Sequence, residues 1–284
     1  MPTYVIVAES GADIPPHLAQ RYNISIVPMH VSLGNETFED GAISVEEALT
    51  FYDKTKQLPT TSGCTPADFA KVFDRIHQEN PEALIIHLAY SAVTTISFES
   101  ALTAAQGRDY VHHFDTKTVS LGQAMVVLSI AEHIAENPDI ELDELKRVIA
   151  QRIAGSHLGF LPGDLSYLRA GGRLSNASFL GAQLLKVAPF VELVNGKLVA
   201  TKMYRGPMLK IAQKMAEEFI RKAKFDSRYF YLLSSPGLKS DVIDAVEALM
   251  ERLGVKHAGW LQPGCVVACH SGPKAFGIVG LATT

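Results

Sequence analysis

Cysteine, long apolar runs and an excess of positive charge are all scarce or missing in this chain of 284 residues. The three cysteines, Cys64, Cys265 and Cys269, are too few and odd in number for a disulfide framework, so we expect a reducing, cytoplasmic setting. No run approaches the roughly 18 unbroken apolar residues of a membrane-spanning helix, and Met1–Ser10 lacks the basic start of a signal peptide. The formal net charge of −4 argues against non-specific binding of nucleic acid.

Several sequence signals of common enzymes are also missing. The chain contains no G-x-S-x-G nucleophile elbow, no G-x-x-x-x-G-K-[ST] phosphate loop, no G-x-G-x-x-G dinucleotide loop and no H-E-x-x-H zinc motif. Serine, histidine and aspartate are plentiful, but abundance alone does not place them in a catalytic triad. The sequence therefore offers no nucleotide-binding device of its own, and we assign no catalytic residue.

What the sequence does contain is an alternation of strand-like and helix-like segments. Up to about residue 155, this alternation predicts a parallel sheet sandwiched by helices. Beyond that point, a hairpin and late apolar runs predict a mixed sheet with helices on one side. We therefore expect an α/β fold of two domains, residues 1–155 and 156–284. The segments expected in them include strands over Ser25–Leu33, Val255–Leu261, Cys265–His270 and Phe276–Ala282, and a polar loop over Thr60–Pro66.

The stretch from Asp164 to Gly206 carries the most specific pattern. We expect, in order, a short helix ended by Gly171-Gly172, a helix over Asn176–Lys186 capped by Ser175, and strands over Ala188–Val194 and Lys197–Tyr204. Asn195-Gly196 predicts a hairpin between these strands, because both turn positions need positive φ. Arg173 and Arg205 lie beside glycines in this stretch. Arginine can bind a carboxylate or phosphate through two parallel hydrogen bonds, although an isolated arginine is more often simply solvated.

Hydroxyl side chains gather on two loops that lead into helices. Thr61-Ser62 precedes a helix that Thr65 caps, and Ser91 and Thr95 lie on a loop between a buried strand and the next helix. Hydroxyls together with the free N–H groups of a helix start make a good site for a carboxylate or phosphate. The same residues also fit an ordinary helix cap with its loop, so both interpretations stay open.

Two further polar residues follow apolar runs. Ser10 follows the first expected strand, where it can reach a site at the carboxyl ends of parallel strands or serve only as a turn residue. His270 can offer a proton to a ligand, or be a partly exposed side chain without a role. Cys265, Cys269 and His270 could suggest a metal site, but neighbouring positions of a strand face opposite ways, so we expect no metal.

These motifs resemble the DegV family, whose bacterial members include the FakB fatty-acid-binding proteins. The resemblance rests on an Asp-Leu-x-x-Leu-x-x-Gly-Gly-Arg-(Ile/Leu)-Ser run, here Asp164–Ser175, and on a hairpin that ends in Lys-x-x-Arg-Gly, here Lys202–Gly206. The Thr-Ser loop at Thr61, the loop from Ser91 and the His-x-Gly-Pro turn at His270 match in the same order. The departures from the family pattern include Gly63-Cys64, Ile96 and Lys274, and Glu9 stands where the family usually has Asp.

The resemblance implies a two-domain α/β protein that binds one long-chain fatty acid in a tunnel between the domains, without another cofactor. The carboxylate of the lipid would be bound by a set of polar side chains, Thr61, Ser62, Thr95, His270, Ser10 and Ser91. Arg173 and Arg205 would lie at the partner surface or the mouth of the site. The implied partner is a separate ATP-dependent fatty-acid kinase, which converts the presented carboxylate to an acyl phosphate for phospholipid synthesis. A transient contact with a membrane surface is compatible with this cargo.

A different class of function competes with this interpretation. A hydrolase or phosphotransferase could use Ser62 or Ser91 as the nucleophile and His270 as the base. A fatty acid released from native protein would favour the carrier, whereas turnover of ester substrates without a partner would favour the enzyme. The missing catalytic motifs and the resemblance together predict a lipid-binding carrier subunit, not an enzyme.

Overall fold

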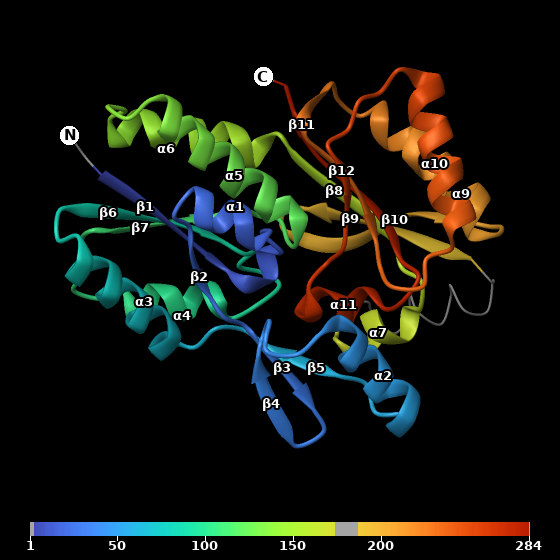
Figure 1. Cartoon of the computed structure of the whole chain (residues 1–284), viewed down its shortest axis with the longest axis horizontal. Coiled ribbons are helices and arrows are strands. Elements are labelled where there is room, and N and C mark those ends of the chain that lie inside the picture. The colour runs from blue at the N-terminus through green and yellow to red at the C-terminus, as the bar shows by residue number, and fades with distance from the viewer. Residues whose placement is uncertain (1–2, 174–186, 284) are drawn as a thin grey trace.

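The first sheet of the protein is parallel and covered on both faces, as the sequence predicts. The computed structural model describes residues 3–173 and 187–283, and Figure 1 shows it with helices above and below this sheet. The strand order is β2-β1-β6-β7, with bounds Ser25–Val27, Thr3–Glu9, Ala83–Ala89 and Val111–Asp115. The helices on one face are α1 (Pro16–Arg21), α5 (Leu121–Glu136) and α6 (Leu142–Ala154), and those on the other are α3 (Pro66–Glu79) and α4 (Ser97–Ala104).

Two helix starts follow directly from the sequence. Thr65 accepts a hydrogen bond from the N–H of Asp68, and the Asp68 carboxylate accepts one from the N–H of Thr65, so a capping box begins α3. Ser44 and Glu47 make the same reciprocal pair at the start of α2 (Val45–Thr55). These boxes satisfy backbone donors that the first helical turn leaves without partners. None of the helices within residues 3–173 and 187–283 is long and apolar enough to cross a bilayer.

The second sheet has six strands and is mixed, which confirms the predicted fold class. Its order is β10-β9-β8-β13-β11-β12, and all neighbours run antiparallel except β11 and β12. In that order the strands span Lys197–Tyr204, Ala188–Val194, Ser156–Leu161, Phe276–Ala282, Phe225–Ser234 and Gly259–Leu261, and helices α9 (Met208–Ile220) and α10 (Ser240–Leu253) cover one face. The hairpin turn has φ of 50° at Asn195 and 80° at Gly196, as its sequence predicts.

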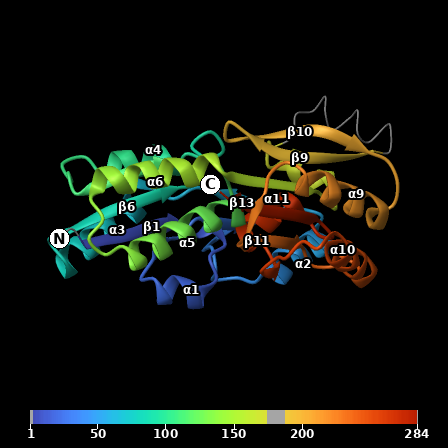
Figure 2. The same cartoon turned by 90° about the horizontal axis from the view of Figure 1, so that it is seen from above.

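Helix α5 joins the two large sheets. It contacts β1 and β6 of the first sheet and β8 and β13 of the second, and one hydrophobic core, which includes Ile86, Met125 and Val279, crosses between them. Figure 2 shows the two sheets side by side along the long axis of the molecule. The proposed domain boundary falls at Gly155, between α6 and β8, so this shared core spans both sides of it.

A small third sheet was not predicted. Pro28 interrupts the single strand expected over Ser25–Leu33, since proline has no N–H for a ladder, and a new strand, β3 (His30–Leu33), turns away. It pairs antiparallel with β4 (Glu36–Glu39) and with β5 (Thr60–Ser62). The first part of the expected Thr60–Pro66 loop is therefore a strand, and this strand carries Thr61.

Two late strands were also predicted wrongly. The run expected as a strand over Cys265–His270 is a helix, α11 (Cys265–Ser271), and only Gly259–Leu261 of the run from Val255 pairs in the sheet. α11 contacts α2, α7 (Leu165–Ala170), β3 and β5, so most of its circumference is buried and its sequence lacks a polar face. The helix expected over Asn176–Lys186, with Ser175 as its cap, lies outside the described residues.

Candidate functional site

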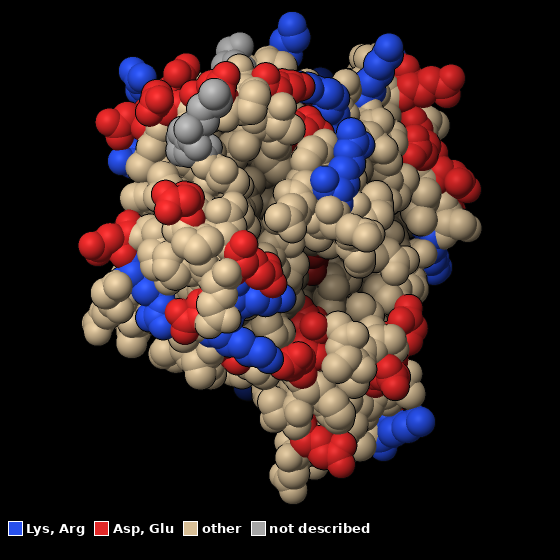
Figure 3. Space-filling view, turned by 60° about the vertical axis from the view of Figure 1, so that its left-hand side comes forward, with Lys and Arg blue, Asp and Glu red and all other residues tan. Residues whose placement is uncertain are grey.

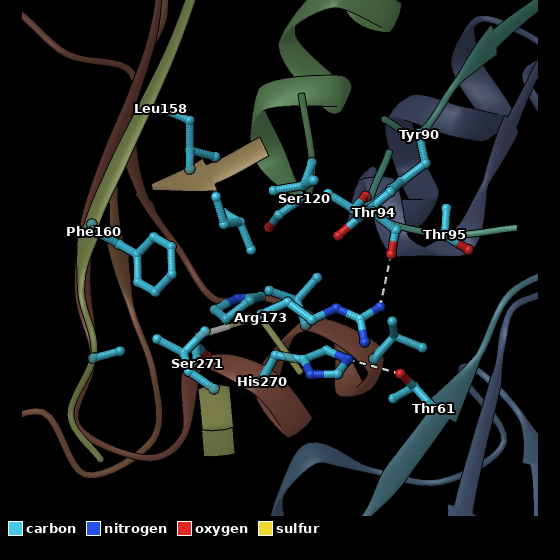
Figure 4. A pocket seen from close by; sticks show the side chains of 18 of the residues that line it. Thr61, Tyr90, Thr94, Thr95, Ser120, Leu158, Phe160, Arg173, His270 and Ser271 are labelled. Carbon is cyan, nitrogen blue, oxygen red and sulfur yellow. Dashed lines mark hydrogen bonds between the residues drawn. The ribbon is translucent and has the colours of Figure 1, made fainter. Parts of the chain in front are cut away.

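A cavity lies where β5, α5, α11 and the second sheet meet. Its volume is about 910 Å³, which includes the part that opens to solvent. Figure 3 shows the surface hollowed along the middle of the molecule, and Figure 4 shows the cavity from close by. Most of its wall is apolar, with side chains from both halves of the chain: Val119, Leu158, Phe160, Leu168, Leu198, Leu233, Val266 and Phe276. The cavity can therefore bury a hydrocarbon chain.

One end of the cavity is polar, and its centre is the pair Thr61 and His270. The Thr61 hydroxyl lies 2.7 Å from Nε2 of His270, which joins strand β5 to helix α11 (Figure 4). Burial of the ring and the nearby charge of Arg173 lower the pKa of His270 to about 3. His270 is therefore neutral at physiological pH, with one ring nitrogen protonated.

The packing of Gly171 decides which nitrogen of His270 carries the proton. A Cβ built on Gly171 would lie 2.1 Å from Nδ1, so a Cα hydrogen of Gly171 already points at that atom and leaves no room for an N–H. Nδ1 also has no hydrogen-bond partner among the described residues. We therefore assign the proton to Nε2, which donates to the Thr61 oxygen. The hydroxyl hydrogen of Thr61 is then free to donate into the cavity.

Arg173 brings a positive charge to this polar end. Its Nη1 donates to the carbonyl of Gly171 at 2.5 Å and its Nη2 to the carbonyl of Thr94 at 2.9 Å, so the guanidinium spans from the end of α7 to the loop before α4 (Figure 4). Of the described residues that line the cavity, Arg173 alone carries a full charge at neutral pH. A guanidinium has further N–H donors beyond these two bonds, so it can also bind an anion.

The loop after β5 packs closely against the loop before α4, beside Thr61, and this close packing requires a glycine at position 63. A Cβ on Gly63 would lie 2.5 Å from Oγ1 of Thr95 and 2.6 Å from Oγ of Ser97. The N–H of Cys64 donates to Oγ of Ser97 at 3.0 Å, which ties the loops together. Ser62 and Thr95 both line the cavity as a result.

The structure thus brings five of the eight expected site residues to one cavity: Thr61, Ser62, Thr95, Arg173 and His270. The other three, Ser10, Ser91 and Arg205, are not among its lining residues. Ser10 accepts a hydrogen bond from the N–H of Met29, and Ser91 donates to the carbonyl of Gly196 at 2.8 Å. Arg205 is exposed at the end of β10.

Sequence reasoning missed Ser120 and the carboxyl group that supports it. Ser120 lines the cavity at the start of α5 and has an unusual backbone, with φ of 52° and ψ of −140°. Its hydroxyl is 2.5 Å from Oδ2 of Asp13, whose Oδ1 accepts from the N–H of Gly264, just before α11. Desolvation raises the pKa of Asp13 to about 8. The signal for Asp13 was its place after the first parallel strand, where ligand sites gather.

The departures from the family pattern have different structural consequences. Ile96 has φ of −80°, in the right-handed region, so this position does not require glycine. Lys274 has φ of 64°, in the left-handed region that favours glycine.

Cys265 and Cys269 lie on the helix α11 and not on the strand we expected. One turn apart, they share a face, as they would on a strand too, whereas His270 directly follows Cys269 and lies on another side of the helix. Among the residues that the structure describes, no group of three or more His, Cys, Asp or Glu side chains is arranged to hold an ion. All three cysteines are free and buried.

Fold and site together define a class: an α/β protein of two large sheets with an apolar cavity whose polar end carries hydroxyl, imidazole and guanidinium groups. The chain belongs to the DegV family, because the family model described as "uncharacterised protein, DegV family" matches residues 3–283. A DegV domain-containing protein of Deinococcus radiodurans is 29% identical over 280 residues, which cover 96% of each chain.

Solved structures resemble the whole chain. A DegV family protein from Thermus thermophilus, described by its fatty-acid binding, is 26% identical with a TM-score of 0.84, over 99% of this chain and 100% of that one. The fatty acid kinase B3 protein of Streptococcus pneumoniae, loaded with linoleic acid, has a TM-score of 0.83 over 99% and 100% of the two chains. Its 16% identity shows a shared fold.

Proposed function

We propose that this protein binds one long-chain fatty acid in the cavity and presents its carboxylate to a separate ATP-dependent fatty-acid kinase. The observation that carries the proposal is the junction of a long apolar wall with an end where Thr61, His270 and Arg173 converge. Of the described lining residues, none is acidic, so that end suits an anion. A fatty acid has the matching shape, with a hydrocarbon chain and one anionic head.

The energetics favour such a ligand. Each methylene group that leaves water for the apolar wall contributes roughly 0.8 kcal/mol, so a long chain binds more tightly than a short one until the cavity is full. The carboxylate would lose hydration on entry, which is costly unless charged or polar donors replace the water. Thr61 O–H and Arg173 N–H supply such donors, and Ser62 and Thr95 add hydroxyls nearby.

The relatives support the same proposal. The Thermus thermophilus protein is described by its fatty-acid binding, and the Streptococcus pneumoniae protein carries linoleic acid. The latter is also described as part of a fatty acid kinase, which supports a kinase partner for this chain. We propose a cytoplasmic setting for this exchange, and the exposed side chains of Val93 and Ile96 on the loop beside the cavity suit a transient contact with a membrane surface.

The competing hydrolase or phosphotransferase lacks its central hydrogen bond. Within the described residues, His270 Nε2 is bonded to Thr61, and neither Ser62 nor Ser91 is hydrogen-bonded to His270. A serine nucleophile needs a base within hydrogen-bond reach. The carrier role is therefore the better match to the geometry.

The test is to identify what the native protein carries. Gentle native mass spectrometry of freshly purified protein should show a bound long-chain fatty acid, which solvent extraction then identifies. Loaded protein incubated with ATP and a fatty-acid kinase should yield an acyl phosphate, trapped by hydroxylamine as a hydroxamate. Hydroxamate formed without the kinase would make this chain an enzyme, and protein that neither carries nor binds any fatty acid would refute the proposal.

A further inference from the structure

Two buried serines interrupt the apolar wall of the cavity. Ser235 and Ser271 both line it, and they are only 4% and 7% exposed. Ser271 is the last residue of α11 and Ser235 directly follows β11, so the pair joins the helix that carries His270 to the second sheet. Figure 4 shows Ser271 on the side of the His270 ring away from Thr61. The pair is therefore separate from the hydroxyl groups of the polar end.

The surroundings of this serine pair are apolar. Ser235 comes two residues after Leu233, and both line the cavity, as side chains two apart on a strand share a face. In the neighbouring strands, Gly277 of β13 lies opposite both Leu233 and Phe160. The N–H of Ser235 donates to the carbonyl of Ala275 at 3.0 Å, which extends this pairing by one step. Phe160, Ala275 and Gly277 also line the cavity, and none of them has a polar side chain.

The two serine hydroxyls have unused hydrogen-bonding capacity. Their oxygens lie 3.4 Å apart, which is longer than the roughly 2.5–3.0 Å of an ordinary O–H···O bond. Neither hydroxyl has another partner among the described residues. Each hydroxyl has one hydrogen to donate and two lone pairs, so a bond within the pair uses at most one of the two hydrogens. Because a buried polar group without a partner is costly, the pair favours a ligand that brings a polar group to it.

We propose that Ser235 and Ser271 bind a hydroxyl group on the acyl chain, so that the cavity prefers a hydroxy fatty acid to the plain acid of the same length. The inference rests on the proposed function, since the carboxylate must still be bound at the polar end. A hydroxyl group fits because it is small and neutral, and it can accept from one serine while it donates to the other. A plain hydrocarbon chain covers both serines and offers them no partner. A charged group needs a counter-ion, which the apolar neighbours do not supply.

The test compares stearate with hydroxystearates, which have the same chain length. The hydroxyl is placed near the carboxyl group, at the middle of the chain or near the methyl end, and both enantiomers of each are titrated separately by calorimetry. In the wild type, one position and one enantiomer should bind more tightly than stearate by roughly threefold to tenfold, because the serine pair gains hydrogen bonds. One enantiomer should be preferred because the two serines are fixed on one side of the chain.

Alanine variants show whether the serines cause this preference. In the double variant Ser235→Ala with Ser271→Ala, the bound hydroxyl loses both partners. The affinity for that hydroxystearate relative to stearate should fall roughly tenfold to a hundredfold. Each single variant should lose part of the preference. Ser234→Ala is the matched control, because Ser234 is also buried but is not part of the cavity wall, so the wild-type ratio should remain. The melting temperature of each variant checks the fold.

The outcomes separate this inference from the proposed function. A wild type that binds stearate at least as tightly as every hydroxystearate would overturn the serine site while leaving fatty-acid binding intact. A preference for a hydroxystearate that survives in the double variant would overturn it as well, because the hydroxyl is then bound elsewhere. A wild type that binds neither stearate nor any hydroxystearate would refute the proposed function and this inference with it.

Discussion

The hydroxyl of Thr61 and Nε2 of His270 lie 2.7 Å apart, although 209 residues separate them in the sequence. The pair connects β5, in the small third sheet, to α11, which lies between β12 and β13 of the second sheet. Its proton arrangement leaves the Thr61 hydroxyl hydrogen free, with the Arg173 guanidinium nearby (Figure 4). The polar end of the cavity therefore depends on how the two halves of the chain pack.

Replacing Thr61 by valine should weaken fatty-acid binding while the secondary structure is kept, and it should lower the unfolding free energy by about 1–3 kcal/mol because the Nε2–H of His270 loses its acceptor. Valine keeps the shape and the β-branch, and it suits a strand at least as well as threonine. The change removes the donor to the carboxylate, and a hydrogen bond to a charged group contributes about 1.5–3 kcal/mol, so affinity should fall roughly ten- to a hundredfold. Titration with a fatty acid measures the loss, and circular dichroism checks the fold.

Thr60→Val is the matched control for this variant. Thr60 precedes Thr61 on β5, is exposed and does not line the cavity. Because its side chain is exposed and is not part of the cavity wall, this change should leave affinity as in the wild type. Wild-type affinity in Thr61→Val would remove Thr61 from the site and leave Ser62, Thr95 and Arg173 to bind the carboxylate.

Adding a methyl group at Gly171 should damage the site through His270. The backbone of Gly171, with φ of −73° and ψ of −2°, accepts alanine without strain, but its Cβ would lie 2.1 Å from Nδ1 of His270. The ring must move and its bond to Thr61 should break, so we expect fatty-acid affinity to fall about tenfold.

The neighbouring glycine separates this steric effect from a backbone effect. Gly172 has φ of 69° and nothing within 4 Å of a built Cβ. Gly172→Ala should therefore cost about 1–2 kcal/mol of unfolding free energy while affinity stays close to the wild type. If Gly171→Ala binds as well as Gly172→Ala does, the assigned position of His270 is wrong.

Ser91 offers a test between two interpretations of one residue. The sequence suggested a carboxylate donor, but its hydroxyl donates to the carbonyl of Gly196 and closes the hairpin onto the loop before α4. Ser91→Ala should lower the unfolding free energy by about 1–3 kcal/mol, because a buried carbonyl loses its partner. Fatty-acid affinity should change less than in Thr95→Val, since Thr95 lines the cavity. The reverse order of affinities would return Ser91 to the carboxylate site.

Local sequence signals predicted much of the fold. The spacing of apolar residues and the identity of capping residues are short-range properties of the sequence. The helix starts at Ser44 and Thr65 and the Asn195-Gly196 turn could therefore be predicted from the sequence alone. The alternation of strands and helices likewise predicted the parallel first sheet, because parallel strands need crossover connections. Motif resemblance then brought Thr61 and His270 into one site, which no local spacing could do.

The errors arose where tertiary packing overrides local preference. The run Cys265–Ser271 has the β-branched residues and apolar character of a strand, but it is a helix packed on several elements, so it shows no polar face. Pro28 has a different explanation, because it is a local signal that we did not use: it divides one expected strand into parts of two different sheets. Asp13 and Gly264 are 251 residues apart in the sequence, so no local sequence pattern predicts their hydrogen bond.

The last prediction concerns that buried contact and its pH dependence. Desolvation, together with the nearby charge of Asp40, raises the pKa of Asp13 to about 8 from an ordinary value of 3.8. The folded protein therefore holds this proton more tightly than the unfolded chain does. The protonated carboxyl of Asp13 makes its full contribution to the unfolding free energy below about pH 4, and this contribution is lost as the pH rises towards 8.

Asp13→Asn should remove this pH dependence. Asparagine tolerates the left-handed backbone of this residue, which has φ of 58°, and its amide can still bond Ser120 and accept from Gly264. As the pH is raised from 5 to 9, the melting temperature of the variant should rise relative to that of the wild type. The difference should be about 2–4 °C for each kcal/mol of unfolding free energy that the wild type loses. Asp13→Ala loses the hydrogen bonds as well, so it should melt below Asp13→Asn at every pH. If the melting temperatures of the wild type and Asp13→Asn change equally with pH across this range, Asp13 is already ionised in the folded protein.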